Sequence, residues 1–195
     1  MFDQWMLPVL GLVQGLTEFL PVSSSGHLIL AHALLDFSIN GLAIDAVLQL
    51  ATVLAVVVYF WKDICALYLP EHRTTVYALL IGTVPAVVAG LFLEDTMATV
   101  FRAPELVAYA LLAGSGVMLA AEYVSRTTEL PLVWWKQGVV AGLFQALALV
   151  PGMSRSGMTI SGGMFLGMSR SEAARFGFLL SVPILAGSGL KKLLD

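Results

Sequence analysis

Two short polar segments interrupt an otherwise apolar chain, and they hold the side chains best suited to chemistry. The first, Gln14-Gly-Leu-Thr-Glu18-Phe-Leu-Pro-Val-Ser23-Ser-Ser-Gly26-His27, combines an acid, an imidazole and three hydroxyls. Gln14 and Glu18 are four residues apart, so on a helix their side-chain oxygens share a face and could bind one divalent cation. The serines and Gly26 precede an apolar run, where free N–H groups and hydroxyls can bind phosphate. The structural alternatives are a neutral, hydrogen-bonded glutamic acid and a serine helix cap.

The second polar segment, Pro151-Gly-Met-Ser154-Arg155-Ser156-Gly157, places an arginine inside a long apolar stretch. An arginine does not lose its proton to avoid the cost of burial, so it needs an anionic partner. That partner is either a protein carboxylate such as Glu18 or a phosphate group of a ligand. Because serine, glycine and a helix start surround Arg155, the pattern favours phosphate binding over a purely structural ion pair.

The composition restricts the classes of protein in which these segments can act. Of the 195 residues, 58% are hydrophobic and only 12% are charged, whereas an average soluble domain has about 25% charged residues. The net charge of −3 argues against nucleic-acid binding, and the single Cys65 excludes an internal disulfide. No Lys or Arg precedes the first apolar stretch, so we expect that stretch to belong to the mature protein rather than to a signal peptide. The sequence therefore predicts a single membrane domain.

Four uncharged stretches approach the roughly 20 residues that a membrane-spanning helix needs. They are residues 46–61, 74–93, 106–121 and 176–190. The two polar segments divide further apolar sequence into half-length pieces. These pieces are residues 4–20 and 28–35 around the first segment, and residues 137–150 and the glycine-rich stretch to 168 around the second. Because such a pattern is typical of a re-entrant hairpin, we predict an all-α, polytopic membrane protein with two re-entrant helical hairpins.

The two hairpins are copies of each other. Gly26 and Gly157 match at an offset of 131 positions, and so do Gly11 and Gly142, Gln14 and Gln145, Leu16 and Leu147, Ser23 and Ser154, Ser25 and Ser156, and Ile29 and Ile160. Three spanning helices separate the copies. Because three is odd, the hairpins must enter from opposite faces in an inverted repeat, and their tips can meet near the middle of the membrane.

The repeat also predicts how the chain is divided. The first repeat covers about residues 1–125 and the second about residues 134–195, both within one domain of residues 1–195. The second repeat is two helices short of the first. If the chain ends here naturally, we expect a homodimer, or a groove filled with lipid, to cover the side that those helices would occupy, because exposed backbone groups are costly in lipid. If the sequence is truncated, we expect low stability and little activity.

Charges in the loops give the expected orientation. One face collects Lys62, Arg73, Arg126, Lys136, Arg170 and Arg175, and the other has Arg102, Lys191 and Lys192. By the positive-inside rule the first face is cytoplasmic, and the N-terminus lies outside. Arg170 and Arg175, near Glu172, are expected to be solvated charges at the membrane surface.

The polar segments resemble those of the undecaprenyl-diphosphate phosphatases, also called bacitracin-resistance proteins. The resemblance rests on residues 14–27 and 151–157, with Thr159 beyond them, and extends to residues 50–56, 82–88 and 178–183. It implies a multi-pass enzyme of the bacterial inner (plasma) membrane that hydrolyses a C55 isoprenoid diphosphate to the monophosphate with a divalent cation, Mg or Ca. This reaction recycles the lipid carrier of cell-wall (peptidoglycan) synthesis. Members of the family continue for about two more helices, in agreement with the repeat.

The expected reaction is phosphoryl transfer at the point where the two tips meet. Arg155 and the cation hold the diphosphate, while Glu18 and Gln14 bind the metal or Glu18 acts as a base. Ser24 is the expected nucleophile, activated by His27 or Glu18, with direct attack by water as the competing chemistry. His27 could instead be the acid for the leaving group, or a structural histidine bonded to a carbonyl. The positions expected to contact substrate are Gln14, Ser23, Ser25, Gly26, Ser154, Ser156, Gly157 and Thr159.

A secondary transporter or flippase of an anionic, phosphorylated substrate is the alternative function. Inverted repeats with broken helices and helix ends at the middle of the membrane are typical of transporters as well. Transport, however, needs no nucleophile, base and arginine in one place, so the residue types favour an enzyme.

Overall fold

The computed structural model describes residues 6–34, 41–93, 96, 100–125 and 134–194, and within these residues it contains helices and no strand. The longer helices are α1 (Met6–Thr17), α2 (Ser24–Leu34), α3 (Gly41–Tyr59), α5 (Arg73–Phe92), α7 (Pro104–Ser125), α8 (Trp134–Leu147), α9 (Arg155–Phe165) and α10 (Arg170–Leu194). Shorter pieces are α4 (Trp61–Ala66) and the 3₁₀ turns η1 (Pro70–His72) and η2 (Val100–Arg102). The described part of the chain is therefore all-α, as the sequence predicts.

Three helical segments are long and apolar enough to cross a membrane: Pro70–Phe92, Pro104–Ser125 and Arg170–Lys191. Two of the four predicted spans, residues 106–121 and 176–190, lie within them, and a third, residues 74–93, ends one residue beyond Phe92. The fourth prediction falls on α3, whose 19 residues extend about 28 Å at 1.5 Å per residue, close to the roughly 30 Å of a hydrocarbon core. Within α3, residues Ala46–Tyr59 form a shorter apolar helix. The chain is thus an all-α, polytopic membrane protein.

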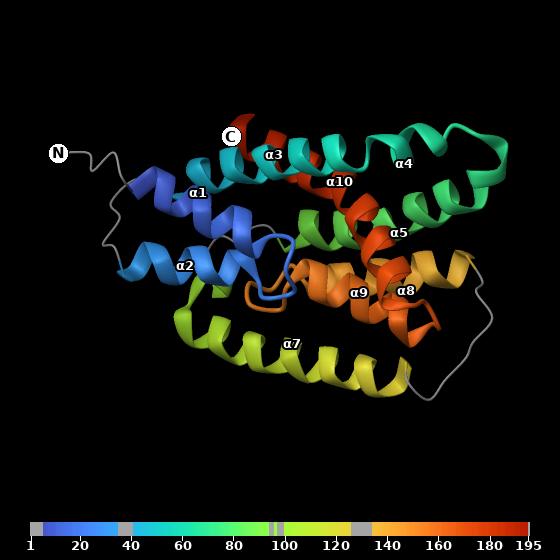
Figure 1. Cartoon of the computed structure of the whole chain (residues 1–195). Helices are drawn as coiled ribbons and strands as arrows, with labels where there is room; N and C mark the ends of the chain where they lie inside the picture. The colour runs from blue at the N-terminus through green and yellow to red at the C-terminus, as the bar shows by residue number, and fades with distance from the viewer. Residues whose placement is uncertain (1–5, 35–40, 94–95, 97–99, 126–133, 195) are drawn as a thin grey trace.

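The two half-length pairs form two helical hairpins, α1 with α2 and α8 with α9. In Figure 1, α1 begins and α2 ends at the same end of the molecule, whereas α8 begins and α9 ends at the opposite end. The connections of the two hairpins come together between these ends (Figure 1). This arrangement is the one that the inverted repeat predicts. Re-entry of the hairpins into the membrane stays a prediction.

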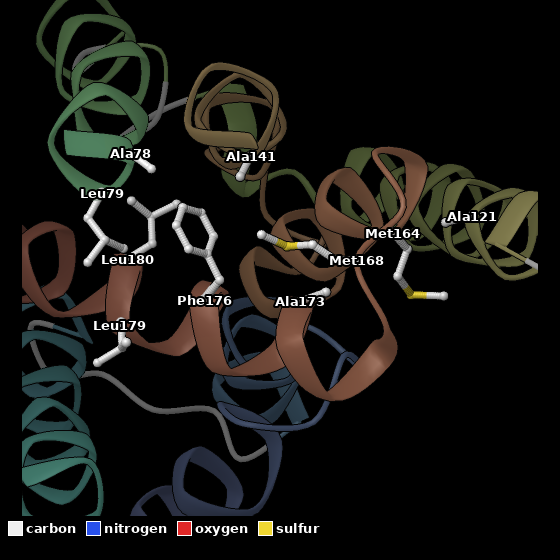
Figure 2. Packing of buried hydrophobic residues seen from close by; sticks show 10 residues of the cluster. All are labelled: Ala78, Leu79, Ala121, Ala141, Met164, Met168, Ala173, Phe176, Leu179 and Leu180. Carbon is white, nitrogen blue, oxygen red and sulfur yellow. The ribbon is translucent and has the colours of Figure 1, made fainter. Parts of the chain in front are cut away.

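Helix α10 joins the two halves of the molecule. It packs along α3 of the first repeat and against α9 and α5. A cluster of buried side chains forms at its first turns, where Phe176 and Leu180 point toward Ala78 of α5 and Ala141 of α8 (Figure 2). Since helices in lipid associate through close packing rather than by escaping water, this cluster is what fixes α10 against its neighbours.

Helix α8 lies in direct backbone contact with α5. A methyl group added to Gly138 would come within 2.5 Å of the carbonyl oxygen of Ala78, and one added to Gly142 within 2.5 Å of that of Gly82. Only glycine allows so close an approach, and glycines four residues apart are a frequent contact surface of membrane helices. The second hairpin is therefore held in place by the face of α8 that carries these two glycines.

Candidate active site

The first tip, residues 18–23, connects α1 to α2 through an unusual serine. Ser23 has φ of 65°, a left-handed conformation that costs a residue other than glycine about 1–2 kcal/mol. Its hydroxyl accepts a hydrogen bond from the amide of Gly26 at 3.4 Å and lies 3.4 Å from the hydroxyl of Ser25. The side chain of Ser23 thus caps the first turn of α2, the structural role that the sequence left open for the serine run.

The second tip, residues 148–154, repeats this conformation. Ser154 has φ of 60°, accepts a hydrogen bond from the amide of Gly157 at 3.2 Å and lies 3.3 Å from the hydroxyl of Ser156. The match between the two tips extends from sequence to backbone, since the same unusual φ occurs at the same position of each copy. Both glycine amides that the sequence assigns to phosphate are already bonded to a serine hydroxyl.

The two tips touch each other. The amide of Gly152 donates to the hydroxyl of Ser23 at 3.0 Å, and the hydroxyl of Ser156 donates to the carbonyl of Leu20 at 3.0 Å. A third connection is the ion pair between Arg155 and Glu18. The meeting of the tips, inferred from the count of three spans, is therefore found in the structure.

Glu18 is the centre of this contact. Its buried carboxylate, 7% exposed, accepts hydrogen bonds from Gln14 Nε2 at 2.9 Å, from the hydroxyl of Ser24 and from Nη2 of Arg155. Three donors from α1, α2 and α9 thus converge on one acid. Because both ions are held in a largely water-free place, the attraction between Arg155 and Glu18 is only weakly screened.

Two polar atoms beside this carboxylate have no hydrogen-bond partner. They are Oε1 of Gln14, an acceptor, and Nη1 of Arg155, a donor. Unpaired buried polar groups are costly and uncommon in folded proteins. Because the two side chains bond to the Glu18 carboxylate through Nε2 and Nη2, respectively, these two atoms are candidate ligand contacts: the amide oxygen for a cation and the guanidinium for an anion.

His27 is not part of this cluster. Its Nδ1 lies 2.8 Å from the carbonyl oxygen of Ser23, and its side chain is exposed. Among the alternatives that the sequence leaves open, this contact is the structural one. The hydroxyl of Ser24 points to Glu18 instead, so of the two possible activators of Ser24 it is Glu18 that the structure places in contact with it.

The remaining predicted position, Thr159, lies behind the site. It is fully buried, and its hydroxyl donates to the carbonyls of Arg155 at 3.0 Å and Ser156 at 3.2 Å within α9. A methyl group on Gly177 of α10 would come within 2.7 Å of this hydroxyl. Thr159 therefore supports the helix turn that carries Arg155, and its expected contact with substrate stays a prediction.

Gln145 was not selected as a site residue, although it is the repeat partner of Gln14. Its side chain is 1% exposed, Nε2 lies 3.5 Å from the carbonyl of Gly82, and Oε1 has no partner. The repeat itself was the signal that could have identified it. The equivalent of Glu18 in the second copy is Leu149, so no acid stands one turn after Gln145.

A metal cluster of the usual kind is not found. Within the described ranges, no group of three or more His, Cys, Asp and Glu side chains is placed to hold an ion. Glu18 is the one carboxylate of the two tips and Gln14 supplies the one unpaired amide oxygen beside it. Such a sparse oxygen set fits Mg²⁺, which usually keeps several waters and is bound by one or two carboxylates together with phosphate oxygens of the substrate.

Comparisons with known proteins find one matching family model and several similar sequences. A family model described as "Bacitracin resistance protein BacA" matches residues 7–195. A protein of Mycobacterium bovis (strain BCG / Pasteur 1173P2) named undecaprenyl-diphosphatase is 46% identical over 204 residues, covering 98% of this chain and 74% of the relative. A protein of the same name from Mycolicibacterium smegmatis (strain ATCC 700084 / mc(2)155) is 48% identical over 200 residues, covering 96% of this chain and 72% of the relative.

Proposed function

The chain belongs to the family of the bacitracin resistance protein BacA, and from this we propose that it is an undecaprenyl-diphosphatase of the membrane. It hydrolyses undecaprenyl diphosphate to undecaprenyl phosphate and phosphate. The names of the relatives support the substrate and the reaction. The regenerated monophosphate carries cell-wall precursors, and an enzyme that removes the diphosphate form confers resistance to bacitracin.

The observation that carries the proposal is the convergence of Ser24 and Arg155 on Glu18. A hydroxyl in contact with a carboxylate can lose its proton to it as it attacks phosphorus. A guanidinium beside the same carboxylate can bind the phosphate under attack through its two-pronged donor set. A nucleophile, a base and an anion-binding group therefore lie within one contact network, which transport alone does not require.

The charges of the site argue for a cation. Glu18 and Arg155 neutralise each other, so a diphosphate entering between them adds negative charge that the pair does not balance. In a place from which water is largely excluded, uncompensated charge is strongly unfavourable. We propose that Oε1 of Gln14 and the carboxylate of Glu18 hold Mg or Ca together with phosphate oxygens. When bound, the cation neutralises charge that builds up on those oxygens during transfer.

The residues would act in sequence. As the substrate binds, its phosphate replaces Glu18 on Arg155, which frees the carboxylate. Glu18 then takes the proton of Ser24 while Oγ bonds to the terminal phosphorus, and the bond from that phosphorus to the bridging oxygen breaks to release undecaprenyl phosphate. Water next attacks the phosphoserine, which releases phosphate and restores the hydroxyl. Direct attack by a water activated by Glu18 is the competing route, and in that route Ser24 only binds substrate.

The other serines and glycines of the tips are proposed to shape the site rather than to react. Ser25 and Gly26 follow Ser24 in the chain, Ser154 and Gly157 lie within two residues of Arg155, and the hydroxyls of Ser23 and Ser154 cap the helices. His27 is exposed and lies outside the Glu18 cluster. We propose that it acts as the acid that protonates the leaving group.

We propose that the site opens to the outer side of the bacterial inner membrane. Among the described residues, Lys62, Arg73, Lys136, Arg170 and Arg175 belong to segments at one end of the molecule (Figure 1). This end is cytoplasmic by the positive-inside rule. Arg126 of the same set lies outside the described residues.

We propose that the exposed face of α1 contacts a second copy of the chain in a homodimer. Leu12 and Leu16 on this helix are 63% and 60% exposed, and a methyl group on Gly15 would meet nothing within 4 Å. The equivalent leucines of α8, Leu143 and Leu147, are exposed as well, at 53% and 52%. A second copy is the partner that the repeat suggests for the first hairpin.

The decisive test is phosphate release from undecaprenyl diphosphate by the purified protein in detergent, with and without Mg²⁺. We expect phosphate release that depends on the cation. This release should be lost in the single variant Ser24→Ala and in the single variant Glu18→Gln. Thr83→Ala is the matched control, because its hydroxyl bonds within α5 to the carbonyl of Leu79. Uptake of a labelled phosphorylated substrate into vesicles without any hydrolysis would contradict the phosphatase and support the transporter.

A further inference from the structure

We propose that Ser23 and Ser156 form a clasp between the two tips and act as positioning residues for the reaction rather than as contacts of the substrate. The clasp consists of two hydrogen bonds: from the amide of Gly152 to Oγ of Ser23, and from Oγ of Ser156 to the carbonyl of Leu20, each 3.0 Å long. The inference rests on the proposed function, because it concerns how the reacting groups of that site are aligned.

The first step concerns the hydrogen bonds that the two hydroxyls form. Ser23 and Ser156 are 3% and 4% exposed. A serine has one hydrogen to donate, and Ser156 donates its hydrogen to the carbonyl of Leu20. Oγ of Ser23 accepts from the amides of Gly26 and Gly152, which occupies both of its acceptor positions. The hydrogen of Ser156 and an acceptor position of Ser23 are thus both used in the contact between the tips.

The second step is the place of the clasp in the chain. Leu20 follows Glu18 by two residues, and Ser156 follows Arg155 directly. The bond from Ser156 to Leu20 therefore joins the backbones immediately beside the two charged groups. A small shift of one tip relative to the other would move Arg155 away from Glu18 and from the phosphate that it binds, and errors of about 1 Å in such an arrangement can lower a rate a hundredfold.

The third step is an asymmetry in the repeat. Ser154 has the same positive φ and the same helix cap as Ser23, so a symmetric clasp would join Ser154 to the residue equivalent to Gly152. That residue is Pro21, which has no N–H to donate. The bond of Ser156 to Leu20 supplies the second connection instead. Ser23 is thus both a cap and part of the clasp, whereas Ser154 is a cap.

The fourth step is the support of the second tip. A methyl group on Gly152 would come within 2.5 Å of the carbonyl oxygen of Val107, and one on Gly114 within 3.0 Å of that of Met153. The second tip is therefore seated directly on α7. Because the clasp joins the two tips, it also holds the first tip and Glu18 in place relative to α7.

The test combines kinetics with a distance. Ser156→Ala and Ser23→Ala are prepared in a Cys65→Ala background, and nitroxide spin labels are attached to cysteines at Leu16 and Leu143. These two positions are 60% and 53% exposed, on the helices that lead into the two tips. Ser181→Ala is the control, because Ser181 is fully buried but its hydroxyl bonds within α10 to the carbonyl of Phe178.

We expect both clasp variants to lower kcat for undecaprenyl diphosphate at least tenfold, to change KM less than twofold and to broaden the distribution of distances between the labels. Ser181→Ala should match the parent protein in all three. A raised KM with unchanged kcat and an unchanged distance distribution would overturn the clasp and make Ser156 a substrate contact. The label distances test the clasp even if the protein hydrolyses nothing, so failure of the clasp and failure of the proposed function give different results.

Discussion

At the scale of single residues, the site in this structure is closed upon itself. The guanidinium of Arg155, which is proposed to bind phosphate, is held by Glu18, which is proposed to bind the cation. Glu18 thus occupies the position on Arg155 at which phosphate is proposed to bind, and Arg155 occupies the position on Glu18 at which the cation is proposed to bind. An ion pair of this kind keeps a buried arginine neutralised between turnovers, because a buried charge without a partner costs several kcal/mol.

The first prediction concerns Arg155. Replacement by Lys keeps the positive charge but loses the planar donor set that matches a phosphate. We expect Arg155→Lys to lower kcat/KM at least tenfold, which corresponds to about 1.4 kcal/mol of transition-state stabilisation. Steady-state kinetics with undecaprenyl diphosphate would measure this. Turnover equal to that of the parent protein would mean that Arg155 contributes only charge.

The second prediction concerns Glu18 and runs against intuition. Glu18→Gln should abolish hydrolysis and the response to Mg²⁺. The same change should strengthen the binding of pyrophosphate in the presence of a chelator by about tenfold, because a ligand binds more tightly when its site is no longer occupied by an internal competitor. Isothermal titration calorimetry would measure the affinity. Weaker binding of pyrophosphate by this variant would show that Glu18 does not compete for Arg155.

At the scale of elements, the second hairpin depends on the backbone contact between α8 and α5. Gly138 and Gly142 of α8 approach Ala78 and Gly82 of α5 more closely than any side chain would permit. The contact fixes where α8 ends and hence where the second tip begins. Both tips then meet because α7 supports the second tip and the second tip supports the first.

The third prediction tests this contact. Gly142→Ala places a methyl group against backbone atoms that cannot move aside, and overpacking of this kind costs about 1–3 kcal/mol. We expect a lower unfolding temperature in detergent and reduced phosphatase activity. Gly90→Ala in α5 is the matched control, because a methyl group there meets nothing within 4 Å and alanine is the better helix former. Equal unfolding temperatures for the two variants would show that the close contact is not needed.

At the scale of the whole molecule, the inverted arrangement of the hairpins places functional groups from both ends of the molecule in its middle (Figure 1). At the end that carries α4 and the first turns of α10, Arg175 forms an ion pair with Asp63 and Arg170 forms one with Glu122. The side chains of Arg175 and Arg170 are 64% and 67% exposed, so they are solvated as expected, and each also has a carboxylate partner. Such exposed pairs contribute little stability, about 0–1 kcal/mol each.

The fourth prediction tests the orientation in the membrane. Tyr68, between α4 and η1, and Ala103, at the start of α7, are both exposed and belong to opposite ends of the molecule. In a Cys65→Ala background, a thiol reagent that does not cross membranes should label Ala103→Cys in intact cells and Tyr68→Cys only after the cells are opened. Labelling of both positions from outside would contradict the prediction that α5 crosses the membrane between them. The reverse pattern of labelling would contradict the assigned sidedness.

The fifth prediction tests the proposed homodimer. Cysteines at Gly15 should cross-link two copies in native membranes, because this face of α1 is open, with Leu12 and Leu16 exposed and nothing within 4 Å of a methyl group on Gly15. Gly116→Cys on α7 is the control, since it too meets nothing within 4 Å. Cross-linking at both positions to the same extent would indicate random collisions, and the proposed interface would then be wrong.

The sequence by itself determined the organisation of the molecule. Charge gaps located the apolar helices, because an ionised side chain is costly in lipid. The offset of 131 residues between the polar segments revealed the inverted repeat and hence the meeting of the tips. These features depend on the length and spacing of the apolar segments, and the sequence alone gives both.

Only the tertiary structure decided which groups meet within the site. Three consecutive serines are equivalent in sequence, but the positive φ of Ser23 turns that residue toward Gly152 and leaves Ser24 on Glu18. Serine has no strong preference for such a backbone, so no local pattern predicts it. The partner of Arg155 lies 137 residues away in the chain, and the sequence could offer only a carboxylate or a phosphate as its counter-ion. The choice of partner depends on how α7, α8 and α10 place the second tip, and that placement follows from packing between distant segments.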